Sequence, residues 1–218
     1  MSIIGKLINI ILHLDSYLNV IIQTYGGWTY ALIFIIIFCE TGLVVTPFLP
    51  GDSILFATGA LAAAGTMKLP ILFLVFYSAA VIGDTVNYQI GKKIGNSIYE
   101  KDNVKYINKE YLKKAHKFYE KHGSMTIVVG RFIPVIRTFV PFVAGVGEMK
   151  YSKFIVYNLL GGLMWVVLFL FGGFFFGNLP IVKDHFSFVL IAIIVISLLP
   201  GIFVFLKEKG STNDDVEA

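Results

Sequence analysis

Long apolar runs separated by short polar segments dominate the pattern of hydrophobic and polar positions along the chain. Residues 69–91, 152–177 and 186–206 are apolar over most of their length, and about 20 such residues are needed to cross the hydrocarbon of a bilayer. We expect a membrane-spanning helix in each range, and a fourth over residues 28–46. The pattern predicts an all-α polytopic membrane protein with about four transmembrane helices.

Two further segments have the helical spacing of an amphipathic surface. Residues 1–24 carry polar side chains three or four positions apart among isoleucines and leucines. This spacing predicts a helix that lies in the membrane interface, with a signal anchor as the alternative. Residues 92–122 form the longest polar stretch and are rich in lysine. Its helical spacing predicts a basic amphipathic helix. Because lysine-rich loops stay in the cytoplasm, we expect this helix to lie on the anionic inner leaflet.

Helix breakers interrupt two of the apolar stretches. The first interruption lies in the second half of residues 28–66, and the second lies within residues 124–147. Proline removes a backbone donor and clashes with the preceding turn, so we expect each segment to form a re-entrant hairpin. The predicted breakers are Pro47, Pro50 and Gly51 in the first hairpin, and Pro134, Pro141 and Gly145 in the second.

The positions of the lysines predict the orientation in the membrane. Lys207 and Lys209 follow the last span, so we expect the C-terminus in the cytoplasm and, from the number of crossings, the N-terminus there too. The two hairpins then enter from opposite faces, as in the inverted repeats of many transporters. We expect one membrane domain over residues 1–207 and a cytoplasmic tail over residues 208–218.

Composition supports the membrane assignment. Hydrophobic residues make up 56% of the 218-residue chain and charged residues 15%, whereas soluble domains average about 25% charged residues. Lysines beside the predicted spans give the net charge of +4, which favours anionic lipid headgroups over nucleic acid as partners. Cys39 is the one cysteine, so no internal disulfide can form.

Five ionisable side chains lie in or near the apolar segments, where each costs roughly 2.5–3.5 kcal/mol at a helix centre. They are Glu40, Asp52, Asp84, Arg131 and Arg137. Each carboxylate has a structural alternative, as an interfacial residue for Glu40, a helix N-cap for Asp52 and the cytoplasmic edge of a span for Asp84. Arginine stays charged at any accessible pH, so the two arginines need anionic partners or water.

The chemistry of these five groups favours anion binding and proton exchange. With every group ionised, three carboxylates and two guanidiniums leave one excess negative charge, which protonation of one buried carboxyl group would remove. Arg131 and Arg137 suit a phosphate, because a guanidinium binds phosphate through two parallel hydrogen bonds. The sequence has no metal-ligand spacing, and none of its histidines lies beside the arginines. We therefore expect no metal, no cofactor and no enzymatic activity.

Three motifs resemble those of the bacterial DedA family, within the wider class of VTT-domain membrane proteins. They are Glu40 with P-F-L-P-G-D at 47–52, G-D-x-x-x-Y-x-x-G at 83–91, and G-R-F-x-P-x-x-R-T-x-x-P-x-x-A-G at 130–145. The resemblance extends over residues 28–165. It implies two opposed re-entrant hairpins, a location in the bacterial cytoplasmic membrane, and essential charges at Glu40, Asp52, Arg131 and Arg137.

The resemblance also implies transport of a phospholipid or a polyprenyl phosphate, notably undecaprenyl phosphate, linked to proton motive force. Under this hypothesis Arg131 and Arg137 bind the phosphate, while the carboxylates pair with the arginines or exchange the coupling ion, a proton or sodium. Two alternatives stay open. One is a proton-coupled transporter of a small ion or oxyanion, and the other is a membrane lipid phosphatase. The sequence does not indicate an oligomeric state.

Overall fold

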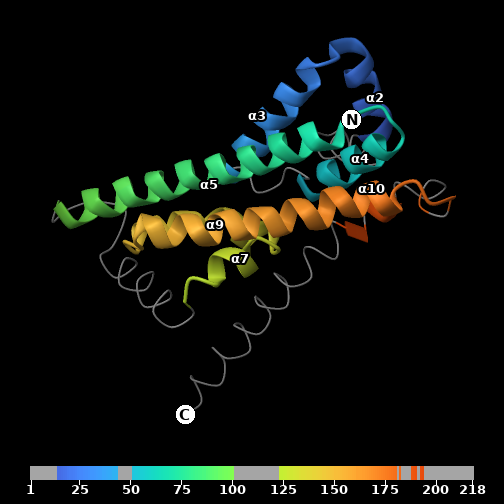
Figure 1. Ribbon diagram of the computed structural model, residues 1–218. Coiled ribbons are helices and arrows are strands. Elements are labelled where there is room, and N and C mark those ends of the chain that lie inside the picture. The colour runs from blue at the N-terminus through green and yellow to red at the C-terminus, as the bar shows by residue number, and fades with distance from the viewer. Residues whose placement is uncertain are drawn as a thin grey trace, which may run out of the picture.

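The computed structural model describes residues 14–43, 51–100, 123–180, 182, 188–190 and 192–193. Every regular element within these ranges is a helix, so the predicted all-α class is confirmed for this part of the chain. Two long helical rods lie side by side, and shorter helices pack around them (Figure 1). Several predicted segments lie outside the described residues: residues 1–13 of the interfacial helix predicted at 1–24, residues 101–122 of the basic helix predicted at 92–122, most of the span predicted at 186–206, and the tail.

The first rod is α5, Leu69–Glu100. Its 32 residues make a helix about 48 Å long, and the part from Leu69 to Gly95 is apolar enough to cross a membrane. The helix continues past residue 91, where we expected it to end, through the exposed Lys92 and Lys93. Because the hydrocarbon is only about 30 Å thick, the rod is long enough to carry these lysines out to the headgroups.

The second rod is built from three consecutive elements: α9 (Tyr151–Val166), the π-helical η1 (Val167–Phe171) and α10 (Gly172–Phe176). Together they form a predominantly apolar stretch of 26 residues, which is long enough to cross a membrane and agrees with the span predicted at 152–177. A π-helical turn inserts an extra residue into the helical ladder and is frequent at functional sites. Here it follows directly after Trp165 and Val166, both fully buried.

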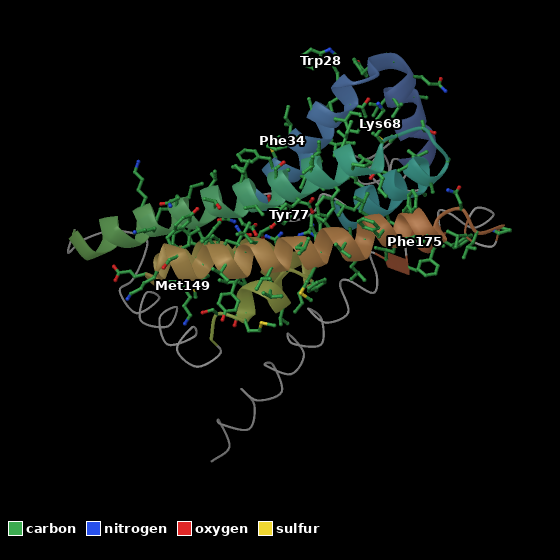
Figure 2. All side chains as sticks on the ribbon, viewed as in Figure 1. Trp28, Phe34, Lys68, Tyr77, Met149 and Phe175 are labelled. Atoms are coloured by element: carbon green, nitrogen blue, oxygen red, sulfur yellow. The ribbon has the colours of Figure 1, made fainter. Side chains whose placement is uncertain are left out.

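Large apolar side chains cover the outer surfaces of both rods. Leu74 is 64% exposed on α5, and Leu168 and Phe175 are 56% and 65% exposed on the second rod. Figure 2 shows Phe175 near the far end of that rod, directed away from the rest of the molecule. Soluble proteins rarely expose contiguous apolar surface on this scale, so these faces are suited to contact with lipid.

The chain begins its described part with an arm of two helices, the second of which lies against α5. α2 (Leu14–Tyr25) and α3 (Trp28–Gly42) are joined at Gly26, whose φ of +51° suits glycine. Gly42 packs against the backbone of Gly83 on α5. The 15 residues of α3 extend only about 22 Å, less than the hydrocarbon thickness, and residues 44–50 lie outside the described ranges. The predicted crossing over residues 28–46 therefore stays a prediction.

Three short helices occupy the two segments predicted to form hairpins. The first segment contributes α4, Gly51–Ala63, and the second contributes α7, Thr126–Gly130, and α8, Pro134–Val146. The helical conformation is interrupted between α7 and α8, where Ile133 is extended with φ −112° and ψ 107°. A residue before proline avoids the helical region, so the extended Ile133 separates α7, which ends at Gly130, from α8, which begins at Pro134.

The other predicted breakers have different roles. Pro141 and Gly145 lie inside α8, which continues through both, so their prediction as hairpin breakers was wrong. Proline already has the φ of a helix, and buried packing can offset the hydrogen bond that it removes. Gly51 is the first residue of α4 rather than part of a turn. Pro47 and Pro50 fall outside the described residues.

Glycines bring helix backbones into direct contact at two interfaces. On one side, a Cβ added to Gly59 of α4 or Gly173 of α10 would overlap the backbone of the facing helix. On the other side, a Cβ added to Gly91 of α5 would overlap the backbone of α8, and a Cβ added to Gly145 of α8 would overlap the backbone of α5. Helices approach this closely only where small residues remove the side chains between them. α4 is therefore fixed to the second rod, and α8 is fixed to α5.

The adjacent glycines Gly172 and Gly173 provide a matched test of this packing. Gly173→Ala is expected to lower the free energy of unfolding by about 1–3 kcal/mol, because its Cβ would overlap Phe56. Gly172 has no atom within 4 Å of an added Cβ, so Gly172→Ala should keep or slightly raise stability. Thermal unfolding of both variants in detergent measures the difference. Equal stability of the two variants would contradict the close α4–α10 contact.

Candidate functional site

The five ionisable side chains predicted from the sequence converge in the centre of the molecule. They come from five positions in the fold: Glu40 on α3, Asp52 on α4, Asp84 on α5, Arg131 after α7 and Arg137 on α8. Each exposes 8% or less of its surface. Figure 2 shows nitrogen and oxygen atoms gathered between α5 and α9, near Tyr77. A buried charge is expensive unless it is paired, and the contacts below show how these charges are paired.

The first group is the Arg137 cluster, which consists of Glu40, Asp52 and Arg137. Arg137 uses one terminal nitrogen for each carboxylate: Nη2 pairs with Glu40 Oε1, and Nη1 donates to Asp52 Oδ1 at 2.8 Å. Asp52 lies in the first turn of α4, and its carboxylate is engaged by Arg137. The alternative that Asp52 is only a helix cap therefore does not account for its contacts.

Trp165 completes the surroundings of Asp52. Its indole Nε1 donates a hydrogen bond of 2.8 Å to the same Asp52 Oδ1 that accepts from Arg137. The guanidinium carbon of Arg137 lies 5.3 Å from the centre of the Trp165 ring, within the range of a cation–π interaction. Trp165 thus orients the carboxylate and the guanidinium together, from the point where α9 gives way to η1.

Glu40 is held near the start of α4 by a backbone contact. The Gly51 N–H donates to Glu40 Oε1 at 3.3 Å, and the first N–H groups of a helix favour negative charge. A Cβ on Gly51 would overlap the Glu40 carboxylate, which gives Gly51 a role that the sequence did not reveal. Glu40 is 0% exposed, so its carboxylate contacts protein only, and its depth in the membrane stays a prediction.

The second group is the Arg131 cluster, which consists of Asp84, Arg131 and Asn158. Arg131 Nη2 pairs with Asp84 Oδ2 and donates to Asn158 Oδ1 at 2.7 Å. Asn158 in turn donates from Nδ2 to the Val81 carbonyl at 3.1 Å, so it joins the two rods. Asp84 is 4% exposed, so its carboxylate is enclosed by protein, and the alternative that it lies at the cytoplasmic edge of the span stays open.

Glycines on α9 make room for the Arg131 side chain. A Cβ on Gly162 would lie 3.1 Å from Arg131 Nη1, and one on Gly161 would lie 3.2 Å from Val128 Cα. Asn158, Gly161, Gly162 and Trp165 are spaced so that they share one face of α9. That face therefore lines both arginine clusters.

Asn87 joins α5 to the last turn of α3 and to α8. Its Nδ2 donates to the carbonyls of Thr41, at 3.1 Å, and Thr138, at 2.7 Å. Thr41 is in the last turn of α3, where carbonyl groups have no partner within the helix. Asn87 is fully buried, so this amide fixes α3 and α8 against α5 beside the charged groups.

A small cavity opens between the two clusters. It is lined by Thr41, Asp84, Arg131, Arg137 and Trp165. Among the described residues, Arg131 Nη1, Arg137 Nε and Glu40 Oε2 are buried and have no hydrogen-bond partner. Buried polar atoms are usually satisfied, so two donors without partners on two cavity-lining arginines are consistent with a site for an anion.

Sequence analysis missed Trp165 and Asn158 as parts of this site. The signal was present, because a polar asparagine and a tryptophan away from the expected interface both interrupt an apolar span seven residues apart. That spacing returns to the same helix face after two turns. Within the described ranges, no group of three or more His, Cys, Asp or Glu side chains is arranged to hold a metal ion.

An alanine at Asn158 should weaken the Arg131 cluster. Asn158→Ala removes a hydrogen bond to a charged group and leaves the Val81 carbonyl unpaired, so we expect a loss of about 2–4 kcal/mol in unfolding free energy. Asn178→Ala is the matched control, because Asn178 also bonds a backbone carbonyl, that of Ala60, but outside the site. Denaturant unfolding of both variants tests this, and a larger loss at Asn178 would contradict the pairing described.

Comparison with known proteins identifies the relatives of this chain. The VTT domain family matches residues 49–175. Protein DedA of Escherichia coli K12 is 49% identical over 211 residues, which cover 96% of each chain. Inner membrane protein YqjA of the same strain is 33% identical over 193 residues, covering 86% of this chain and 88% of YqjA.

A further relative and the search of solved structures add little beyond the family. An uncharacterized membrane protein of Mycobacterium tuberculosis H37Rv is 40% identical over 197 residues, covering 88% of this chain and 86% of the relative. No solved structure matches this chain significantly. The VTT match contains α4, α5, α7, α8 and all but the last residue of the second rod, and therefore four of the five converging charges. The chain belongs to the DedA family of VTT-domain membrane proteins.

Proposed function

We propose that this protein transports a phosphate-bearing lipid, such as undecaprenyl phosphate or a phospholipid, across the bilayer. The observation that carries the proposal is the pair of buried arginines beside one cavity, each with an N–H group that has no partner among the described residues. Guanidinium groups match the geometry of phosphate oxygens and keep their charge at any accessible pH. Arg131 Nη1 and Arg137 Nε are the first donors that a phosphate would meet.

The three carboxylates would compete with the phosphate for the two guanidinium groups. Glu40 and Asp52 occupy Arg137, and Asp84 occupies Arg131, so both arginines are paired at membrane depth when no anion is present. An entering phosphate would exchange contacts with these carboxylates one at a time. Such an exchange avoids leaving an unpaired buried charge, which would cost several kcal/mol.

A lipid substrate is favoured by the surroundings of the cavity. The two rods that enclose it present apolar side chains on their outer faces, where the chain of a lipid would remain while its headgroup enters between them. A small free oxyanion is the second candidate, because the cavity itself is small and only five residues line it. Both candidates share the phosphate chemistry, and the experiment below separates them.

The proposal includes an architecture in which the two hairpins form gates. α4 and α8 have 13 residues each, about 20 Å, so neither is long enough to cross the membrane alone. We place them in re-entrant hairpins that enter from opposite faces, within an inverted repeat of about four spans. Both termini would be on the cytoplasmic side of the inner membrane, with the lysine-rich segment on anionic lipids.

Transport rather than catalysis fits the groups around the cavity. Among the residues that line it, Thr41 supplies the one hydroxyl group, and this hydroxyl donates to the Ile37 carbonyl at 2.9 Å. A phosphatase needs an activated nucleophile near its phosphate. Thr41 has no adjacent base in these contacts, and the Asp84 carboxylate, the other possible nucleophile in the lining, is engaged by Arg131. Proton motive force is the proposed energy source, with sodium as the alternative coupling ion.

Reconstitution of the wild-type protein in liposomes tests the proposal. Three probes are followed in parallel: a labelled polyprenyl phosphate, the corresponding uncharged polyprenol, and inorganic phosphate as a soluble oxyanion. We expect the polyprenyl phosphate to change leaflet faster than in protein-free liposomes, with no acceleration for the polyprenol. Uptake of inorganic phosphate without movement of any phosphate lipid would favour the second candidate, and acceleration of the polyprenol would contradict phosphate recognition.

A further inference from the structure

The buried charged groups form two clusters that differ in net charge. Arg131 faces one carboxylate, Asp84, whereas Arg137 faces two, Glu40 and Asp52. With every group ionised, the Arg131 cluster is neutral and the Arg137 cluster carries one excess negative charge. All three members of the Arg137 cluster are buried. An uncompensated buried charge is costly, and such a group usually binds a proton instead.

We propose that Glu40 holds this proton on Oε2, that Trp165 keeps Asp52 ionised, and that the Glu40 proton is the one coupled to transport. The last part rests on the proposed function, whereas the first two concern the protein without substrate. The assignment follows from a comparison of the two carboxyl groups that share Arg137.

Asp52 has the contacts of an ionised carboxylate. Its Oδ1 accepts hydrogen bonds from Arg137 Nη1 and Trp165 Nε1, both at 2.8 Å. Donors directed at a carboxylate favour the charged form. The Trp165 indole has no acceptor nitrogen, so it can only donate and cannot accept a proton from a neutral Asp52.

Glu40 has the contacts of a carboxyl group with one free oxygen. Its Oε1 is engaged by Arg137 Nη2 and, at 3.3 Å, by the Gly51 N–H, so both carboxyl groups lie at the start of α4 and each has two donors on one oxygen. They differ in that Glu40 Oε2 is buried without a hydrogen-bond partner among the described residues, and Glu40 is 0% exposed against 8% for Asp52. In the ionised form of Glu40, part of the negative charge would lie on Oε2, which has no hydrogen-bond donor. The protonated form, with a neutral hydroxyl at Oε2, is therefore more stable. The other charged groups near the cavity, Asp84 and Arg131, neutralise each other.

Protonation of Glu40 would decide whether Arg137 accepts phosphate. When Oε2 carries the proton, Asp52 is the one anion on Arg137, and the guanidinium can take a phosphate. When Oε2 releases the proton to water, the restored carboxylate competes with phosphate for Arg137 and favours its release. One proton therefore moves in the same direction as each phosphate, and an acidic compartment on the side of the lipid should speed its transfer.

Infrared spectroscopy of the substrate-free protein in nanodiscs tests the proton position directly. The protein is made by cell-free synthesis with the side-chain carboxyl carbons of either glutamate or aspartate carrying ¹³C. At neutral pH we expect the C=O band of a protonated carboxylic acid, shifted by labelled glutamate and unaffected by labelled aspartate. Glu40→Gln should remove the band, and Glu148→Gln, at an exposed glutamate outside the site, should retain it.

Trp165→Phe tests the second part of the proposal. Phenylalanine keeps an aromatic ring beside Arg137 but removes the donor to Asp52 Oδ1, so part of the carboxylic-acid band should now shift with labelled aspartate. Asp52→Asn should abolish the band, because the negative charge of Glu40 then equals the positive charge of Arg137 and Glu40 can stay ionised. A wild-type band that shifts with aspartate, or no band at all, would overturn the assignment to Glu40. A Trp165→Phe band that responds only to glutamate would overturn the role of Trp165.

The transport part is tested by the pH gradient, and its failure is distinct from that of the proposed function. Glu40→Gln should bind the polyprenyl phosphate but release it slowly, because glutamine resembles the neutral acid and cannot compete for Arg137. A gradient should no longer change this slow transfer. Persistent gradient dependence in this variant would overturn the coupling role while leaving lipid transport intact. Wild-type protein with the expected infrared band but no lipid transfer would instead overturn the proposed function alone.

Discussion

Arg137→Ala is expected to abolish lipid transfer and to cause the largest loss of stability among single substitutions in the site. Arg137 pairs with two buried carboxylates and stacks beside Trp165, so its removal leaves two buried carboxylates without their cation. Breaking a buried ion pair costs about 3–5 kcal/mol. Loss of a buried charged contact to phosphate would weaken binding by about 2–5 kcal/mol, which is roughly 30-fold or more.

Arg137→Lys separates the charge of this residue from its geometry. Lysine keeps the positive charge but has one compact ammonium group, which cannot bridge Glu40 and Asp52 as a planar fork does. We expect the lysine variant to unfold at a higher temperature than the alanine variant, yet to transfer lipid far more slowly than wild type. Thermal unfolding and the liposome assay give the two readouts. Wild-type transfer by the lysine variant would show that charge alone is sufficient and that the bidentate contact is not needed.

The second large effect is expected when Arg131 and its carboxylate are removed in turn. Arg131→Ala leaves Asp84 buried and unpaired, which should cost about 3–5 kcal/mol of unfolding free energy. Addition of Asp84→Asn removes the stranded charge and should restore most of that stability. Lipid transfer should remain lost in the double variant, because the phosphate has lost one of its two guanidiniums.

A double-mutant cycle of these variants distinguishes a structural ion pair from a phosphate site. Stability and lipid transfer are measured for wild type, Arg131→Ala, Asp84→Asn and the combination. If the pair served only to hold α5 against the α7–α8 link, stability and transfer would recover together in the combination. Recovery of stability without recovery of transfer is the result expected for an arginine that binds substrate.

The sequence was informative where a physical rule links residue type to burial. Charged residues in apolar spans must find partners, and this rule identified Glu40, Asp52, Asp84, Arg131 and Arg137 before their positions were known. All five converge in the structure. The periodicity and length of apolar runs predicted the rods at 69–91 and 152–177 equally well.

The sequence did not reveal how the charges are divided between partners. Three carboxylates could pair with two arginines in several ways, and only the positions of α3, α4, α5 and α8 give the observed division of two and one. Helix boundaries near proline were also misjudged. Pro134 breaks the chain because the preceding residue is extended, whereas Pro141 is accommodated inside α8, and local sequence does not distinguish the two.

Backbone packing explains why the charges can meet at all. Glycines allow α4 to lie directly on α10 and η1, and α8 to lie directly on α5, which brings Asp52 and Arg137 within hydrogen-bond distance. Asp52 and Trp165 therefore belong to one tightly packed set of helices, and Arg137 to the other. A relative movement of the two sets would open the Arg137–Asp52 contact and admit an anion, as the gate in the proposed transport cycle requires.

The most direct test of the phosphate site uses the fact that Arg131 and Arg137 are the two arginines of the entire chain. Uniform ¹⁵N-arginine labelling therefore reports on these two guanidiniums alone. The protein is reconstituted in phosphorus-free glycolipid bilayers with a polyprenyl phosphate, and ¹⁵N–³¹P dipolar coupling is measured by solid-state NMR. We predict coupling between the phosphate and the guanidinium nitrogens of both residues, reduced to one residue in Arg137→Lys. Folded protein that binds the lipid without any ¹⁵N–³¹P coupling would contradict the assignment of the arginines as the phosphate site.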